Sequence, residues 1–207
     1  MKSAFVVGDS ISMHYGPYLE QYLQGWCGYS RKSDGDAALQ SLGGTQSANG
    51  GDSSAVLTYL QAVRDVGKLT ADTLLVNCGL HDIKTEPASG ARQIPINLYG
   101  QNLTGIVEIA SEMGVELIWI RTTPAVDEIH NKPGSTFHRF TADCAAYNAV
   151  ADAVMAENGV PAIDLFGFTS RLGDDVFCDH VHFHPHIREK QAAYIAGWLQ
   201  RHFALKH

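Results

Sequence analysis

A serine, a histidine and an aspartate stand in contexts that suit nucleophilic catalysis. Ser10 follows a short apolar run, in the sequence GDSIS at 8–12, and Asp179 precedes His182 by three residues. An aspartate at that spacing can turn back within one loop and accept a hydrogen bond from one nitrogen of the imidazole. The other ring nitrogen is then free to take a proton from a serine hydroxyl. Taken alone, Gly-Asp-Ser is also typical of an ordinary turn with a serine helix cap.

The elements around these residues predict a mostly parallel sheet. Four short apolar runs are typical of strands that are buried on both faces, namely 4–7, Thr73–Val76, Glu116–Ile120 and 162–165. Segments with helical spacing of apolar residues lie between them, one of them after the candidate caps Asp52 and Ser53. The last helix is expected at about 186–203. Strands that alternate with helices predict a three-layer α/β fold with helices on both faces of the sheet.

Such sheets bind ligands at the carboxyl ends of their strands. Ser10 follows the first predicted strand, and a second polar cluster at 77–82 follows the strand Thr73–Val76. The segments 35–50, 84–95 and 124–139 are polar or rich in glycine, and we expect them to form loops around the site. The sequence shows neither an internal repeat nor a linker, so residues 1–207 are expected to form one domain.

Composition excludes several classes of function. The chain has 15 Lys and Arg against 22 Asp and Glu, which gives a net charge of −7. A nucleic acid partner is not expected, because the phosphate backbone would be repelled. The sequence has no apolar run near the roughly 18 residues of a membrane span and no apparent signal peptide, so we expect a cytoplasmic protein; secretion stays open if a leader has been removed. The four cysteines are scattered and are expected to be buried, reduced thiols: Cys27, Cys78, Cys144 and Cys178.

Four sequence blocks together resemble the GDSL or SGNH hydrolases over nearly the whole chain. The first is GDSIS at 8–12, the second is GDSS from Gly51, the third is GLHD at 79–82 and the fourth is DHVH at 179–182. Softer matches are YGQNL at 99–103 and TTP at 122–124. Any one block could arise by chance, but the four occur in the order of the family and at plausible strand ends.

The resemblance implies a five-stranded, flavodoxin-like sheet and assigns roles to five residues. Ser10 would be the nucleophile, His182 the base and Asp179 the acid of a catalytic triad. The oxyanion hole would consist of the backbone N–H groups of Ser10 and Gly51 together with His81, which stands where the family has asparagine. A neutral histidine has one N–H that can fill the role of the asparagine amide. Glycines at 43–44 and 50–51 leave Gly44 as the alternative to Gly51.

The reaction implied is hydrolysis of a short-chain carboxylic ester without a cofactor, and O-acetyl groups on a carbohydrate are one candidate substrate. Polar, glycine-rich loops suit a small acyl group on a polar alcohol better than a long lipid tail. Two alternatives stay open. One is an acyl thioesterase or lysophospholipase of the same family. The other is a carbohydrate-binding relative that has lost catalysis, because His81 departs from the family pattern.

A metal site is the rival interpretation of the carboxyl-terminal histidines. His180, His182, His184 and His186 alternate, and in a strand they would share one face. Pro185 and the start of the last helix disfavour an extended strand there, and we therefore expect no metal.

Overall fold

The strands form a single parallel sheet in a computed structural model, which describes residues 1–33, 47–67 and 69–205. The strands are β1 (Lys2–Val7), β2 (Cys27–Arg31), β3 (Thr73–Val76), β4 (Glu116–Ile120) and β5 (Ala162–Ile163). Their order in the sheet is β2-β1-β3-β4-β5, and every neighbouring pair is parallel. All the carboxyl ends therefore lie at one edge of the sheet.

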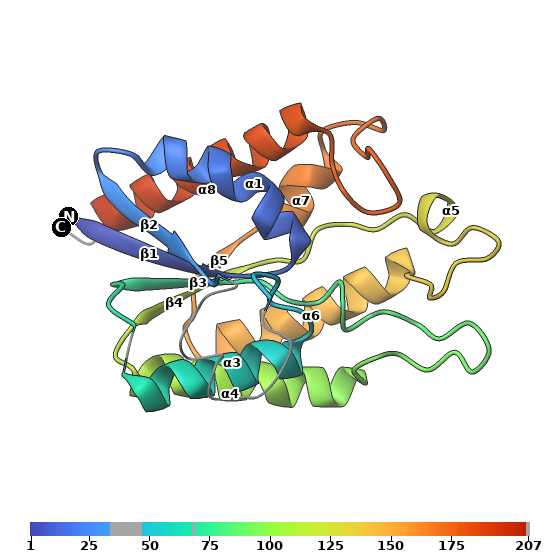
Figure 1. The fold of residues 1–207 in the computed structure, drawn as a ribbon, viewed down its shortest axis with the longest axis horizontal. Helices are drawn as coiled ribbons and strands as arrows, with labels where there is room; N and C mark the ends of the chain where they lie inside the picture. Colours follow the sequence, from blue (N-terminus) through green and yellow to red (C-terminus); the bar gives the residue numbers. More distant parts are fainter. Residues whose placement is uncertain (34–46, 68, 206–207) are drawn as a thin grey trace.

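Helices cover both faces of this sheet (Figure 1). One face carries α1 (Ser10–Leu23), α7 (Leu165–Ser170) and α8 (Pro185–Ala204). The other face carries α3 (Ser53–Val66), α4 (Ile96–Glu112) and α6 (Thr141–Glu157). A single turn, α5 (Asp127–His130), lies in the loop that follows β4. The expected three-layer α/β fold is confirmed.

Apolar burial and helix caps explain why these residues form these elements. All four residues of β3 are buried, and Trp119 of β4 is fully buried beside them. Burying one such leucine or valine side chain contributes about 1.5 to 3 kcal/mol. Asp52 caps α3 as predicted, since its Oδ1 accepts a hydrogen bond from the Ala55 N–H at 3.0 Å. Asp9 caps α1 in the same way by accepting from the Ile11 N–H at 2.9 Å.

Some elements differ from the sequence-based expectation. The edge strand β2 was not predicted, because its sequence CGYSR has almost no apolar run and only Cys27 is buried. Strand β5 ends at Ile163 rather than at 165, since the Asp164 side chain caps α7. The expected loop 124–139 contains the short helix α5.

The cysteines are all free, but one prediction of burial is wrong. Cys27, Cys78 and Cys144 are buried, whereas Cys178 is exposed. Cys178 lies in the loop before α8, where its Sγ is 3.3 Å from the carbonyl oxygen of Phe183 and no layer of the fold covers it.

Among the described residues, no helix combines the length and the apolar character that a bilayer crossing requires.

Candidate active site

Two segments from opposite ends of the chain meet at the carboxyl edge of the sheet. Ser10 is the first residue of α1, directly after β1, and His182 lies in the loop that leads into α8. Helices α1 and α8 pack against each other, which brings these segments together. The Nε2 atom of His182 is 2.8 Å from the Oγ atom of Ser10. This is hydrogen-bond distance for proton transfer between a serine and an imidazole.

Asp179 holds the other side of the same imidazole. Its Oδ2 is 2.7 Å from Nδ1 of His182, and its Oδ1 accepts hydrogen bonds from the backbone N–H groups of Val181 at 2.8 Å and His182 at 2.7 Å. Partial burial opposes ionisation, but these N–H groups and the His182 ring hold the pKa of Asp179 well below its usual range. An ionised carboxylate only accepts, so Nδ1 carries the proton and Nε2 can accept from Ser10.

The second sequence block lies against the first. Gly50 donates its N–H to the carbonyl oxygen of Gly8 at 2.8 Å, and a Cβ at Gly50 would lie 3.1 Å from the Gly8 backbone. Gly51 follows with a φ of +75°, which favours glycine. Its N–H donates to the side-chain Oδ1 of Asn49 at 2.9 Å. An oxyanion could use this N–H only after displacing the Asn49 amide. The alternative, Gly44, lies outside the described residues.

His81 follows β3 and contacts Lys84, with Nδ1 of His81 3.1 Å from Nζ of Lys84. Burial, followed by the positive charges of Lys84 and Arg139, lowers the pKa of His81 to about 4. His182 makes a smaller contribution to the same lowering of the pKa of His81. At neutral pH His81 is therefore uncharged and can donate from one nitrogen only.

Asp82 ties the third block to the second. Both of its carboxylate oxygens accept from the backbone N–H of Ser53, at 3.0 and 3.1 Å. The Ser53 hydroxyl in turn accepts from Nδ2 of Asn102 at 2.9 Å, so YGQNL at 99–103 contributes to the same network. Asp82 is fully buried, and burial raises its pKa to about 6 despite these hydrogen bonds.

Sequence reasoning missed a buried arginine behind the site. Arg139 donates from Nε to the carbonyl oxygen of Leu80 at 2.5 Å, and its Nη1 lies 2.8 Å from Nε2 of His130. Burial raises the pKa of Asp9, and the positive charge of Arg139 opposes that rise. Arg139 thus holds the backbone next to His81, and its positive charge acts on Asp9, the residue that precedes Ser10. No local sequence signal marks it.

Sequence reasoning also missed His14, although its spacing of four residues from Ser10 could have revealed it. Its ring centroid is 4.7 Å from that of His182. Because His14 stands four residues after Ser10 on α1, helical spacing places both on one face. It therefore packs against the His182 ring, with the two ring planes tilted by 54°.

The described residues contain no group of three or more His, Cys, Asp or Glu side chains that could hold a metal. Pro185 begins α8, so the four alternating histidines do not lie in a strand. His182 is bonded to Asp179 and Ser10, whereas the rings of His184 and His186 stack on each other with centroids 5.8 Å apart.

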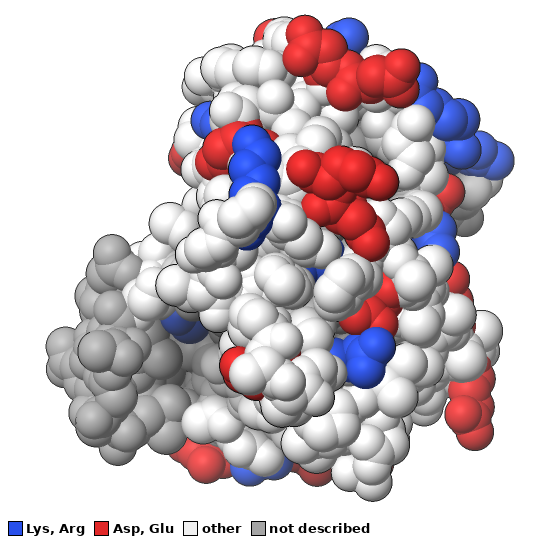
Figure 2. Space-filling model, turned by 90° about the vertical axis from the view of Figure 1, so that its right-hand side faces the viewer, with Lys and Arg blue, Asp and Glu red and all other residues white. Residues whose placement is uncertain are grey.

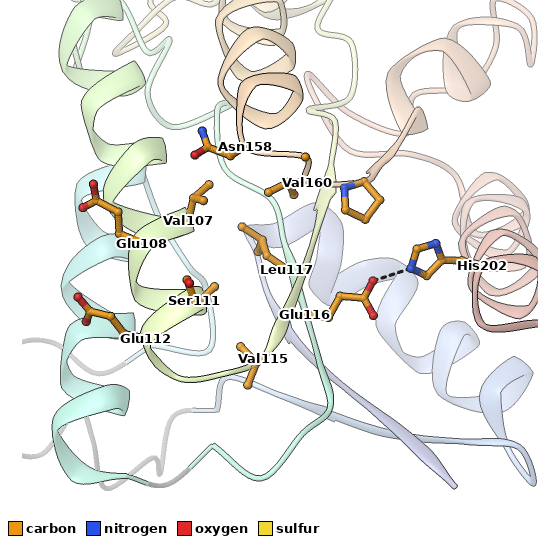
Figure 3. A pocket seen from close by; sticks show the side chains of 13 residues that line it. Val107, Glu108, Ser111, Glu112, Val115, Glu116, Leu117, Asn158, Val160 and His202 are labelled. Atoms are coloured by element: carbon orange, nitrogen blue, oxygen red, sulfur yellow. Dashed lines mark hydrogen bonds and ion pairs between the residues drawn. The ribbon is translucent and has the colours of Figure 1, made fainter. Parts of the chain in front are cut away.

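Two cavities differ in their distance from this chemistry. One of about 830 Å³ lies at the opposite, amino edge of the sheet, where Glu116 of β4 is 2.6 Å from His202 of α8 (Figure 3). The other, of about 620 Å³, is lined by Asp179 and His180 together with residues of the loops at 129–137 and 174–178. The second cavity reaches Asp179, the hydrogen-bond partner of His182, and its volume is typical of a small-molecule site.

Comparison with known proteins fixes the family. A model of the GDSL-like lipase/acylhydrolase family matches residues 6–188. The chain belongs to this family. No curated protein matches it in sequence. Membership of this family supports an ester hydrolase, which agrees with the resemblance found in the sequence blocks.

Solved structures share the fold at low sequence identity. A lipase/acylhydrolase from Enterococcus faecalis is 18% identical with a TM-score of 0.68, covering 98% of this chain and 97% of its own. The psychrotrophic esterase EstA from Pseudoalteromonas sp. is 15% identical with a TM-score of 0.61, covering 97% and 100%. The acetyl xylan esterase AlAXEase is 12% identical with a TM-score of 0.66, covering 93% and 97%. At these identities the likeness shows a shared α/β fold.

Proposed function

We propose that this GDSL-like protein hydrolyses short-chain carboxylic esters through a covalent acyl-enzyme on Ser10. The observation that carries the proposal is the continuous hydrogen-bonded series from the Ser10 hydroxyl through the His182 ring to the Asp179 carboxylate. Three side chains from two segments at opposite ends of the chain meet there at distances of 2.7 and 2.8 Å. A nucleophile, a base and a group that orients the base are what acyl transfer through serine requires.

The first half of the reaction forms the acyl-enzyme. Ser10 Oγ attacks the ester carbonyl while its proton moves to Nε2 of His182. Asp179 stabilises the imidazolium that results. When the tetrahedral intermediate collapses, the bond to the alcohol oxygen breaks, and the proton on Nε2 passes to that alcohol. In the second half, water attacks the acyl group, gives its proton to His182, and the acid leaves as the proton returns to Ser10.

Three N–H donors at the carboxyl edge of the sheet hold the oxyanion in this mechanism. Ser10 opens α1, so its N–H is one of those that a helix leaves without an internal partner and that carry positive potential. Gly51 supplies a second N–H once Asn49 is displaced, and His81 supplies the third donor in place of the family asparagine. Losing one such donor typically lowers kcat by about 10² to 10³.

The surroundings support a small acyl group on a polar alcohol. The cavity beside Asp179 combines the aromatic rings of Phe137 and Phe177 with the polar side chains of Lys132, Ser135 and Asp174. Figure 2 shows that the face carrying the carboxyl ends of the strands bears scattered charges of both signs among mostly uncharged residues. One structural neighbour is named an acetyl xylan esterase. We therefore propose O-acetyl groups on a carbohydrate as the substrate class.

Labelling with a fluorophosphonate tests the nucleophile. The wild-type protein should be labelled and Ser10→Ala should not, while Ser170→Ala, which changes an exposed serine of α7, should keep full labelling. Persistent labelling of Ser10→Ala would refute the proposal. A p-nitrophenyl ester series should show the highest kcat/KM for acetate, and a preference for long acyl chains or for acyl-CoA thioesters would overturn the substrate class.

A further inference from the structure

A histidine in the place of an amide donor raises a problem of proton placement. An asparagine side chain always presents N–H groups. A neutral imidazole has a single N–H, which can sit on either nitrogen, and only one nitrogen can face the oxyanion. Because the pKa of His81 is about 4, double protonation does not remove this ambiguity at neutral pH. Some neighbouring group must select the tautomer if His81 is to act as a reliable donor.

Lys84 is placed to make that selection. Its Nζ lies 3.1 Å from Nδ1 of His81. An ammonium group has three donors and no acceptor, so Nδ1 must be the unprotonated nitrogen and the proton must be on Nε2. The backbone fixes this contact, because Ile83 donates to the Gly79 carbonyl oxygen at 3.0 Å and Lys84 donates to the His81 carbonyl oxygen at 3.3 Å. The turn so formed places the side chains three residues apart beside each other.

Other groups hold the Lys84 ammonium near the ring. Its Nζ lies 5.0 Å from the centroid of the Phe137 ring, a cation–π distance. Burial and the positive charge of Arg139 lower the pKa of Lys84, and the carboxylate of Asp52 opposes that change. Arg139 is the other cation close to His81, but its nitrogens contact Leu80 and His130 instead. Among the described residues, Lys84 is therefore the group that contacts Nδ1 of His81.

We propose that Lys84 is a positioning residue that donates a hydrogen bond to Nδ1 of His81 and thereby fixes the N–H of His81 on Nε2, as the oxyanion donor. This inference rests on the proposed function, in which His81 is the third donor. The pair of Lys84 and His81 then replaces a single asparagine: the histidine supplies the N–H, and the lysine determines where it is.

Nitrogen NMR of His81 and steady-state kinetics on p-nitrophenyl acetate test this together. His81→Asn identifies the His81 signals by their loss. In the wild type, Nδ1 should have the shift of an unprotonated ring nitrogen and Nε2 that of a protonated one. Lys84→Met should mix the two tautomers and raise the pKa of His81, because a positive charge has been removed. It should also lower kcat by about 10- to 100-fold, the effect seen when a histidine that binds a metal loses the hydrogen-bond partner that orients its ring, with little change in KM.

Two further variants separate orientation from charge and folding. Lys84→Arg keeps a cation that only donates and should restore most of the wild-type tautomer and kcat. Lys190→Met removes the same charge from an exposed position on α8 and should leave both readouts at the wild-type value.

The following results would overturn the inference: a protonated Nδ1 in the wild type, or an unchanged tautomer in Lys84→Met. A loss of kcat without a change of tautomer would show that Lys84 acts on the oxyanion by its charge, and would also overturn it. Failure of the proposed function is distinguishable, since it would appear as absence of ester turnover and of Ser10 labelling. The NMR measurement would still decide the role of Lys84 in that case.

Discussion

Replacing Asp179 by asparagine should reverse the proton arrangement of His182. The Oδ1 atom of Asp179 accepts from two backbone N–H groups, and Oδ2 faces Nδ1 of the ring. In Asp179→Asn the amide oxygen should keep the two backbone hydrogen bonds, because turning the amide over would lose both, at about 0.5 to 1.5 kcal/mol each. The amide NH₂ group then faces Nδ1. It donates to Nδ1, so the ring proton moves to Nε2, which can no longer accept from Ser10.

The expected loss in kcat is about 10⁴, the size of effect that a wrong histidine tautomer has in a serine triad. Initial rates on p-nitrophenyl acetate measure it. Asp65→Asn, which removes the same charge from an exposed site on α3, is the matched control and should keep the wild-type kcat. If Asp179→Asn retained kcat within about tenfold of the wild type, the carboxylate would not set the tautomer, and the reasoning would be refuted.

Two other substitutions test the groups around Ser10. His81→Ala should lower kcat by about 10² to 10³, while His81→Asn should restore much of it; equal kcat for His81→Ala and the wild type would contradict the donor role. Asp82→Asn should alter how stability depends on pH. The folded pKa of Asp82 is raised from 3.8 to about 6, so its contribution to stability is present below about pH 4 and is lost as the pH rises through 6. As the pH rises across this range, the wild type should lose about 3 kcal/mol of its free energy of unfolding relative to Asp82→Asn, as measured by chemical denaturation. A difference between the two proteins that does not depend on pH would contradict the raised pKa.

Apolar pattern was enough to predict the central strands and the fold class, because buried parallel strands such as Thr73–Val76 must be apolar on both faces. The pattern failed at the sheet's edges. Strand β2 pairs with β1 through its backbone, and its half-exposed side chains leave no apolar signal. Strand β5 has two residues, and whether the chain continues as strand or turns into α7 depends on a cap at Asp164.

Among the site residues too, some could be predicted from the sequence and others could not. Ser10, Asp179 and His182 could be named because their short sequence blocks carry a recognisable spacing, and the structure brings these three side chains together. Arg139 could not be predicted, since its contacts with Leu80 and His130 depend on how a long loop folds back. The contact of Gly51 with Asn49 likewise follows from a backbone turn that the sequence does not specify.

The central claim is that acyl groups pass through the Ser10 hydroxyl. Its most direct test is mass spectrometry of protein quenched in acid during turnover of p-nitrophenyl acetate. Because p-nitrophenolate is a good leaving group, acylation should be faster than deacylation, so the account predicts up to one acetyl group per chain on the peptide that contains Ser10, absent from unreacted protein. Sustained turnover with no acetylated Ser10 peptide, or with the acetyl group on another residue, would contradict it.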